Sequence, residues 1–180
     1  MGEIKSTLDL VMERTRHLSQ SEEEKTRQRR EDYGKRLQGL LQQYTDGILS
    51  KDALQDRMGA LRSALKVNDQ HALMTSIVGR IDPDRDNRRW LELMDTTAPS
   101  LRHPLEDILT DFSHRKRETL QKSEDRLRER LVSQHGIAGP AVVPNPLKDR
   151  TCRADLAALR QQALDQLEAA ADQALQSNQK

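Results

Sequence analysis

The sequence predicts an all-α protein: a helical bundle with a helical hairpin, one long charged helix and a tethered C-terminal helix that is coiled-coil-like. Ala, Leu, Glu, Lys and Arg make up 82 of the 180 residues, close to the half that is typical of long helices and coiled coils. Leucines recur at spacings of three and four, which is the period of an amphipathic helix. Aromatic residues amount to 2%, and no stretch alternates apolar and polar residues as a strand does. We therefore expect no sheet.

The charge balance and the single cysteine exclude several classes of protein. The chain carries 30 basic and 29 acidic residues, finely mixed, so the net charge implies neither a nucleic-acid partner nor an anionic membrane. One cysteine rules out an intrachain disulfide and a zinc-thiolate cluster. Residues 1–20 are charged throughout, and no run of about 18 apolar residues occurs anywhere. We expect a cytoplasmic protein without a membrane partner.

We expect the first domain, residues 1–135, to be a helical bundle with a charged helical extension. The spacing of Ile4, Leu8, Val11 and Leu18 predicts an amphipathic helix over residues 3–18. Ser21 followed by Glu24 matches a capping box at the start of a second helix. That helix is almost purely charged over residues 22–35, so we expect this part to be solvated.

The second helix continues into a predicted hairpin over residues 36–65. Gly47 can adopt the left-handed conformation that ends a helix, and the Ser50 hydroxyl can cap the next one. Each arm has one apolar stripe that must be buried. The stripes consist of Leu37, Leu40, Leu41 and Tyr44, then Leu54, Met58, Leu61 and Leu65.

The hairpin residues also resemble a known module. A leucine helix with Leu37, Leu40 and Leu41 is followed by Gly-Ile-Leu-Ser-Lys-Asp at 47–52, and then by Leu54 and Leu61. This pattern resembles SHOCT domains, in which a leucine helix precedes Gly-x-Leu-Ser/Thr-x-Asp/Glu. The resemblance covers residues 36–65 and implies a helical hairpin that takes part in association.

Further helices are expected over residues 69–94 and 104–134. Asp82-Pro83 should stop one helix and start the next, with Pro83 in the first turn, and Trp90 should lie in the core. Residues 95–103 read as a loop. The long helix has Leu105, Phe112 and Leu127 on one stripe and should end at Gly136. At about 45 Å it exceeds what a small body can cover, so we expect its far half to extend or to meet a partner.

A flexible linker is predicted over residues 136–151, which contain two glycines and three prolines. Thr151 should cap the C-terminal helix of residues 152–180. Apolar residues alternate at three and four along this helix and form a seam for protein interaction. The seam consists of Leu156, Leu159, Ala163, Leu167, Ala170 and Ala174.

Residues that could carry chemistry are sparse, and we infer no catalytic, metal or cofactor site. Asp111 and His114 mimic the Glu-x-x-His element of di-iron bundles, and they share a helix face with His103, Asp107 and Glu118. Helical geometry places this face nearly opposite the apolar stripe, so we expect it to be solvated. Cys152 begins a helix but has no base near it in the sequence, which favours an inert thiol over a redox-active one.

The basic stretch 115–130 leaves one alternative open. Its basic residues could contact phosphates of a nucleic acid, although acidic residues interleave and no aromatic residue is placed to stack on bases. These residues are Arg115, Lys116, Arg117, Lys122, Arg126, Arg128 and Arg130.

Together, these patterns favour a non-enzymatic protein that self-associates or binds a protein partner. Its apolar seams are longer than one small body can cover. The alternative is a nucleic-acid-associated or ribosome-associated helical protein that uses residues 115–130. No small-molecule substrate is inferred.

Overall fold

A computed structural model describes residues 21–177, and this part of the chain is helical without strands. The predicted all-α fold is therefore confirmed. The predicted helix over residues 3–18 lies outside the described residues. The elements are α2 (Glu22–Thr45), α3 (Lys51–Leu65), α4 (Gln70–Val78), α5 (Arg88–Thr97), α6 (Pro99–His135), the 3-10 helix η1 (Pro146–Lys148) and α7 (Arg150–Ser177).

The chain divides into two compact units, Met1–Asp69 and Gln70–Lys180. The first unit contains α2 and α3, and the second contains α4 to α7. The long helix α6 and the C-terminal helix α7 thus fall in one unit, although the predicted linker lies between them in the sequence.

The start of α2 is stabilised by the capping box that the sequence predicts. The Glu24 amide donates to the Ser21 hydroxyl at 3.1 Å, and the Ser21 amide donates to the Glu24 carboxylate at 2.9 Å. Residues 21–28 are exposed, and Tyr33 is the first buried side chain of the helix. The charged first part of α2 is therefore solvated.

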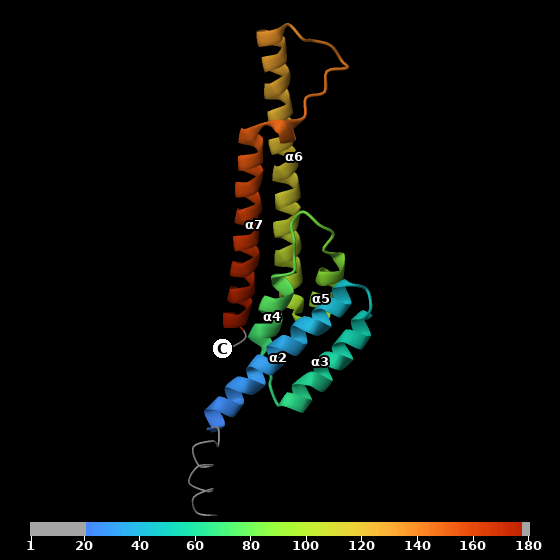
Figure 1. Cartoon of the computed structure of the whole chain (residues 1–180), viewed down its shortest axis with the longest axis vertical. Coiled ribbons are helices and arrows are strands. Elements are labelled where there is room, and N and C mark those ends of the chain that lie inside the picture. Colours follow the sequence, from blue (N-terminus) through green and yellow to red (C-terminus); the bar gives the residue numbers. More distant parts are fainter. Residues whose placement is uncertain (1–20, 178–180) are drawn as a thin grey trace, which may run out of the picture. The chain divides into compact units, whose positions relative to one another are not determined.

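The predicted hairpin is formed by the second half of α2 and by α3, which run antiparallel (Figure 1). Gly47 takes a φ of 76° in the turn, and the Ser50 hydroxyl accepts from the Ala53 amide at 3.2 Å. The local signals of glycine and serine thus act as expected. The buried residues of the two helices are Tyr33, Leu37, Leu41, Tyr44, Leu54, Met58 and Leu61.

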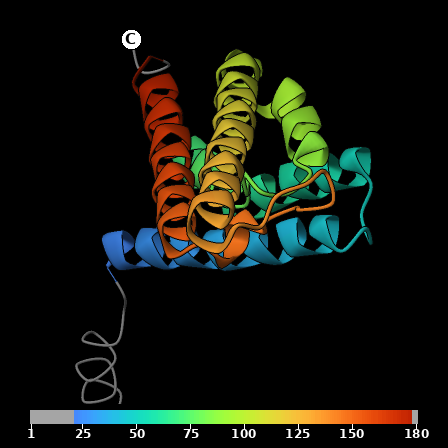
Figure 2. The ribbon, with the colours of Figure 1, turned by 90° about the horizontal axis from the view of Figure 1, so that it is seen from above.

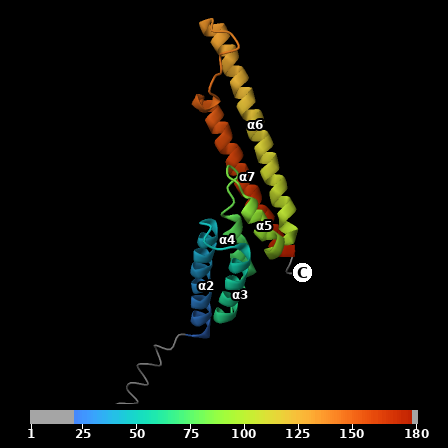
Figure 3. The same cartoon turned by 90° about the vertical axis from the view of Figure 1, so that its right-hand side faces the viewer.

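In the second unit, α6 lies between α5 and α7 (Figure 2). The helix α7 runs antiparallel to α6 and also packs against α4 (Figures 1 and 3). Trp90 of α5 is buried, as predicted for this residue. The buried positions of α4 are Leu73, Met74, Ile77 and Val78.

Two predicted boundaries in this unit are wrong. The helix expected to restart at Pro83 begins at Arg88, because hydrogen bonds between Asp82 and Asn87 fold residues 82–87 into a loop. The loop expected at residues 95–103 does not form. Instead α5 continues to Thr97, and α6 follows after Ala98, with Pro99 at a first-turn position that needs no amide hydrogen.

The cap of α7 also differs from the prediction. The Asp149 carboxylate accepts from the Thr151 amide at 3.3 Å, and the Asp149 carbonyl accepts from the Arg153 amide at 3.2 Å. Asp149 therefore caps the helix in place of Thr151. Aspartate and threonine are both favoured at the N-cap, so the sequence alone did not show which of the two residues caps α7.

Candidate functional site

The packing of α7 on α6 is the central feature of the second unit. Phe112 of α6 forms a buried cluster with Leu159 and Ala163 of α7, and the partly buried Ile108 packs against it. Burial of the large Phe112 ring between the two helices removes its apolar surface from water. Phe112 and Ile108 of α6 thus pack against α7.

The predicted interaction seam of α7 is used largely within the chain. Leu159, Ala163 and Leu167 are buried, whereas Leu156, Ala170 and Ala174 are half-buried. The buried stripe continues instead through positions four apart, which rotates it around the helix as α7 passes from α6 to α4. Its members are Leu159, Ala163, Leu167, Ala171 and Leu175, with the free thiol of Cys152 buried at the start of the helix.

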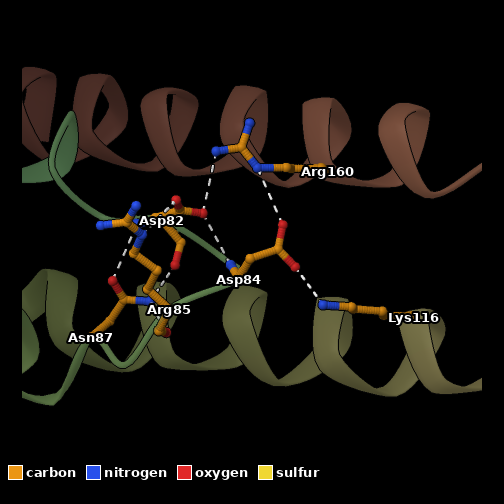
Figure 4. A network of polar contacts seen from close by, with 6 residues as sticks. All are labelled: Asp82, Asp84, Arg85, Asn87, Lys116 and Arg160. Carbon is orange, nitrogen blue, oxygen red and sulfur yellow. Dashed lines mark hydrogen bonds and ion pairs between the residues drawn. The ribbon is translucent and has the colours of Figure 1, made fainter. Parts of the chain in front are cut away.

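A polar network fastens the loop between α4 and α5 to both long helices (Figure 4). The Arg160 guanidinium of α7 donates to Asp82 at 3.2 Å and lies 3.3 Å from Asp84. On the opposite side, the Lys116 ammonium of α6 pairs with Asp84 at 2.5 Å. One short loop with two carboxylates therefore ties α6 to α7.

The loop itself is held by side-chain hydrogen bonds. Asn87, which is 7% exposed, donates to the carbonyls of Asp82 and Arg85 and accepts from the Asp82 amide. The Asp84 amide donates to the Asp82 carboxylate, and this bond, followed by Arg160, lowers the pKa of Asp82. Asp82 is therefore ionised at neutral pH, where its carboxylate accepts hydrogen bonds from the Asp84 amide and from Arg160. Sequence reasoning missed this network, because Asp82 and Arg160 are 78 residues apart.

The basic stretch of α6 is mostly engaged in pairs within the chain. Arg115 lies 3.6 Å from Asp111, Lys116 pairs with Asp84, and Arg128 pairs with Glu124 at 2.7 Å. Arg126 pairs with Asp149, and Arg117 donates to the Ser113 carbonyl. Lys122 and Arg130 form no ion pair with another described residue. These pairs lower the positive field that a phosphate would meet.

The carboxylate and histidine face of α6 points to water. His103, Asp107, Asp111, His114 and Glu118 are all exposed. Over residues 21–177, no group of three or more histidine, cysteine, aspartate or glutamate residues is arranged to hold a metal ion.

The end of α6 extends past the first turn of α7 (Figure 1), and exposed apolar side chains occur on this end and in the segment that joins the two helices. Gly136, at a φ of 62°, ends α6 and donates to the Val132 carbonyl, and a loop then leads to η1, which contacts both α6 and α7. Among the described residues, five large apolar side chains are well exposed, and four of them lie here. We call these four the distal surface: Val132 (48% exposed), Ile137 (47%), Val143 (75%) and Leu147 (54%).

Comparisons with protein-family models, curated proteins and solved structures gave no match to this chain. The resemblance of residues 36–65 to SHOCT domains therefore stays a prediction. In the described part of the chain, no helix combines the length and the apolar character needed to cross a bilayer.

Proposed function

We propose that this chain is a non-enzymatic assembly protein, and that two copies associate through the distal surface. The observation that carries the proposal is the gathering of exposed apolar side chains at the end of α6 and in the loop that follows. Residues 132–147 carry four of the five large apolar side chains that are well exposed in the described part of the chain, and exposed apolar surface of this kind marks sites of protein interaction.

The chemistry of the distal surface favours a second copy as the partner. An apolar patch is complementary to itself across a two-fold axis, which is the commonest symmetry of protein assemblies. Charges of both signs flank it, with Glu129 and Arg130 on α6 and Lys148 in η1, all exposed. Under two-fold symmetry, a carboxylate of one copy can face a cation of the other, so no excess charge opposes the contact.

The size of the patch limits the strength of this association. Four side chains supply less area than the roughly 800 Å² per partner that a stable interface buries. We therefore expect a dimer that forms with rising concentration and dissociates on dilution. The apolar seam of α7 contributes little, because half of its predicted members are buried inside the unit.

Light scattering coupled to gel filtration tests the proposal on the full chain over a wide range of concentrations. The wild-type mass should rise towards that of a dimer. The double variant Val143→Ser/Leu147→Ser should stay monomeric, with an unchanged far-ultraviolet circular dichroism spectrum, since exposed substitutions alter stability by about 0.5 kcal/mol or less.

Ile48→Ser is the matched control. Ile48 is 70% exposed but lies in the turn between α2 and α3, so removing it should leave the dimer intact. A wild-type chain that stays monomeric at the highest concentration contradicts the proposal. So does a double variant that dimerises as well as the wild type.

A further inference from the structure

A polar pocket lies within the first unit, where the early turns of α2 pass the end of α3. Its walls are Thr26, Arg29 and Arg30 of α2 and residues 66–69, which follow α3. The volume is about 290 Å³, just below the usual range for ligand pockets, so the pocket suits only a small ligand. The lining includes three basic side chains and one carboxylate, that of Asp69.

Lys66 is held in a conformation that its side chain does not favour. Its φ is 52° and its ψ is 40°, and among the described residues it is the one non-glycine with a positive φ. The Lys66 amide donates to the Arg62 carbonyl to end α3, a task that glycine performs without steric conflict. A lysine in this conformation is less stable than glycine would be, and strained residues of this kind cluster at functional sites.

The cations of the pocket are largely uncommitted. Arg30 and Lys66 form no ion pair with any residue in 21–177, and the Arg29 guanidinium lies 3.9 Å from the Glu22 carboxylate, at the outer limit of a contact. Asp69 and the carbonyl end of α3 reduce the positive field of the three cations. The Thr26 hydroxyl already donates to the Glu22 carbonyl at 2.8 Å, so the donors left for a ligand are the guanidinium and ammonium groups and the Asn68 amide. Donors of this kind suit a tetrahedral oxyanion.

We propose that this pocket binds a phosphate-class dianion, either free phosphate or a phosphate monoester. The site consists of residues of the first unit alone and shares none with the distal surface. Oxyanion binding and dimer formation can therefore succeed or fail independently.

Proton–nitrogen correlation spectra of the full chain provide the test. Inorganic phosphate, titrated at constant ionic strength against chloride, should shift the amide signals of residues 26–30 and 66–69 in a saturable manner. A parallel titration with phosphoserine distinguishes the two sources. Tighter binding of phosphoserine assigns the site to a phosphate monoester, and equal or weaker binding assigns it to free phosphate.

Substitution of Lys66 separates binding from stability. Lys66→Gly should weaken phosphate binding about tenfold or more, as expected when one charge-assisted hydrogen bond is lost. The same variant should raise the melting temperature by about 2 to 4 °C, because the strain is relieved. A lysine that merely supports the fold would not give weaker phosphate binding together with a higher melting temperature when it is replaced by glycine.

Variants that each remove one charge complete the experiment. Lys66→Gln and Arg30→Gln should each weaken binding, and Asp69→Asn should strengthen it by removing the opposing carboxylate. Lys35→Gln, which removes an exposed cation of α2 outside the pocket, should change nothing. Shifts that do not saturate, that spread over all basic residues, or that persist equally in Lys66→Gln indicate an adventitious ion only and overturn the proposal.

Discussion

Replacing Phe112 by alanine should weaken the packing of α7 on α6. The ring is 3% exposed and packs against Leu159, Ala163 and Ile108. Its removal leaves a void that the two helices fill poorly, and substitutions of this kind reduce the free energy of unfolding by about 3 to 5 kcal/mol. Because domains unfold with only about 5 to 15 kcal/mol, the loss is a large fraction of the stability of this unit.

Urea unfolding followed by circular dichroism measures this loss. With a slope of about 1 to 3 kcal/mol per molar urea, the midpoint of Phe112→Ala should fall by about 1 M or more. Ser113→Ala is the control, because Ser113 is the exposed neighbour of Phe112 on the same helix and its replacement should alter stability by about 0.5 kcal/mol or less. A loss below about 1 kcal/mol for Phe112→Ala would refute the packing of α7 on this ring.

Three further predictions concern the polar network, the hairpin and the basic stretch. The pKa of Asp82 is lowered by the Asp84 amide and then by Arg160. The stability that ionised Asp82 contributes is therefore present above the pKa of an unfolded aspartate, near 3.9, and is lost as the pH falls through the lower pKa of the folded state. Asp82→Asn should therefore reduce the loss of stability on acidification, measured by unfolding at a series of pH values. Ser50→Ala should reduce stability by about 1 kcal/mol, measured by thermal unfolding, because the Ala53 amide loses its cap. In gel shifts at moderate salt, the protein should not retard duplex DNA, since four of the seven basic residues of 115–130 are ion-paired within the chain. Retardation of the DNA that falls steeply as the salt concentration rises would instead favour nucleic-acid binding.

The elements that sequence reasoning predicted well depend on local signals. The turn of the hairpin follows from Gly47 and Ser50, and the start of α2 follows from Ser21 and Glu24, because each of these residues acts within four positions of itself. The end of α6 at Gly136 has the same origin. Local steric and hydrogen-bonding rules are sufficient for such features.

The features that were missed depend on distant contacts. The two prolines near residue 100 suggested a loop, but Pro99 occupies a first helical turn and Pro104 is accommodated inside α6. The buried stripe of α7 departs from the predicted seam, because α7 meets α4 as well as α6. The role of Arg160 could not be read from its neighbours, since both of its carboxylate partners lie in the loop before α5.

The place of α7 in the second unit also bears on the order of folding during synthesis. The ring of Phe112 and the loop carboxylates of Asp82 and Asp84 receive their partners from a helix that is translated after them. The α2–α3 hairpin, in contrast, has both arms available once residue 65 has left the ribosome. The nascent chain therefore closes its first unit early, whereas the second holds an open apolar face until α7 emerges.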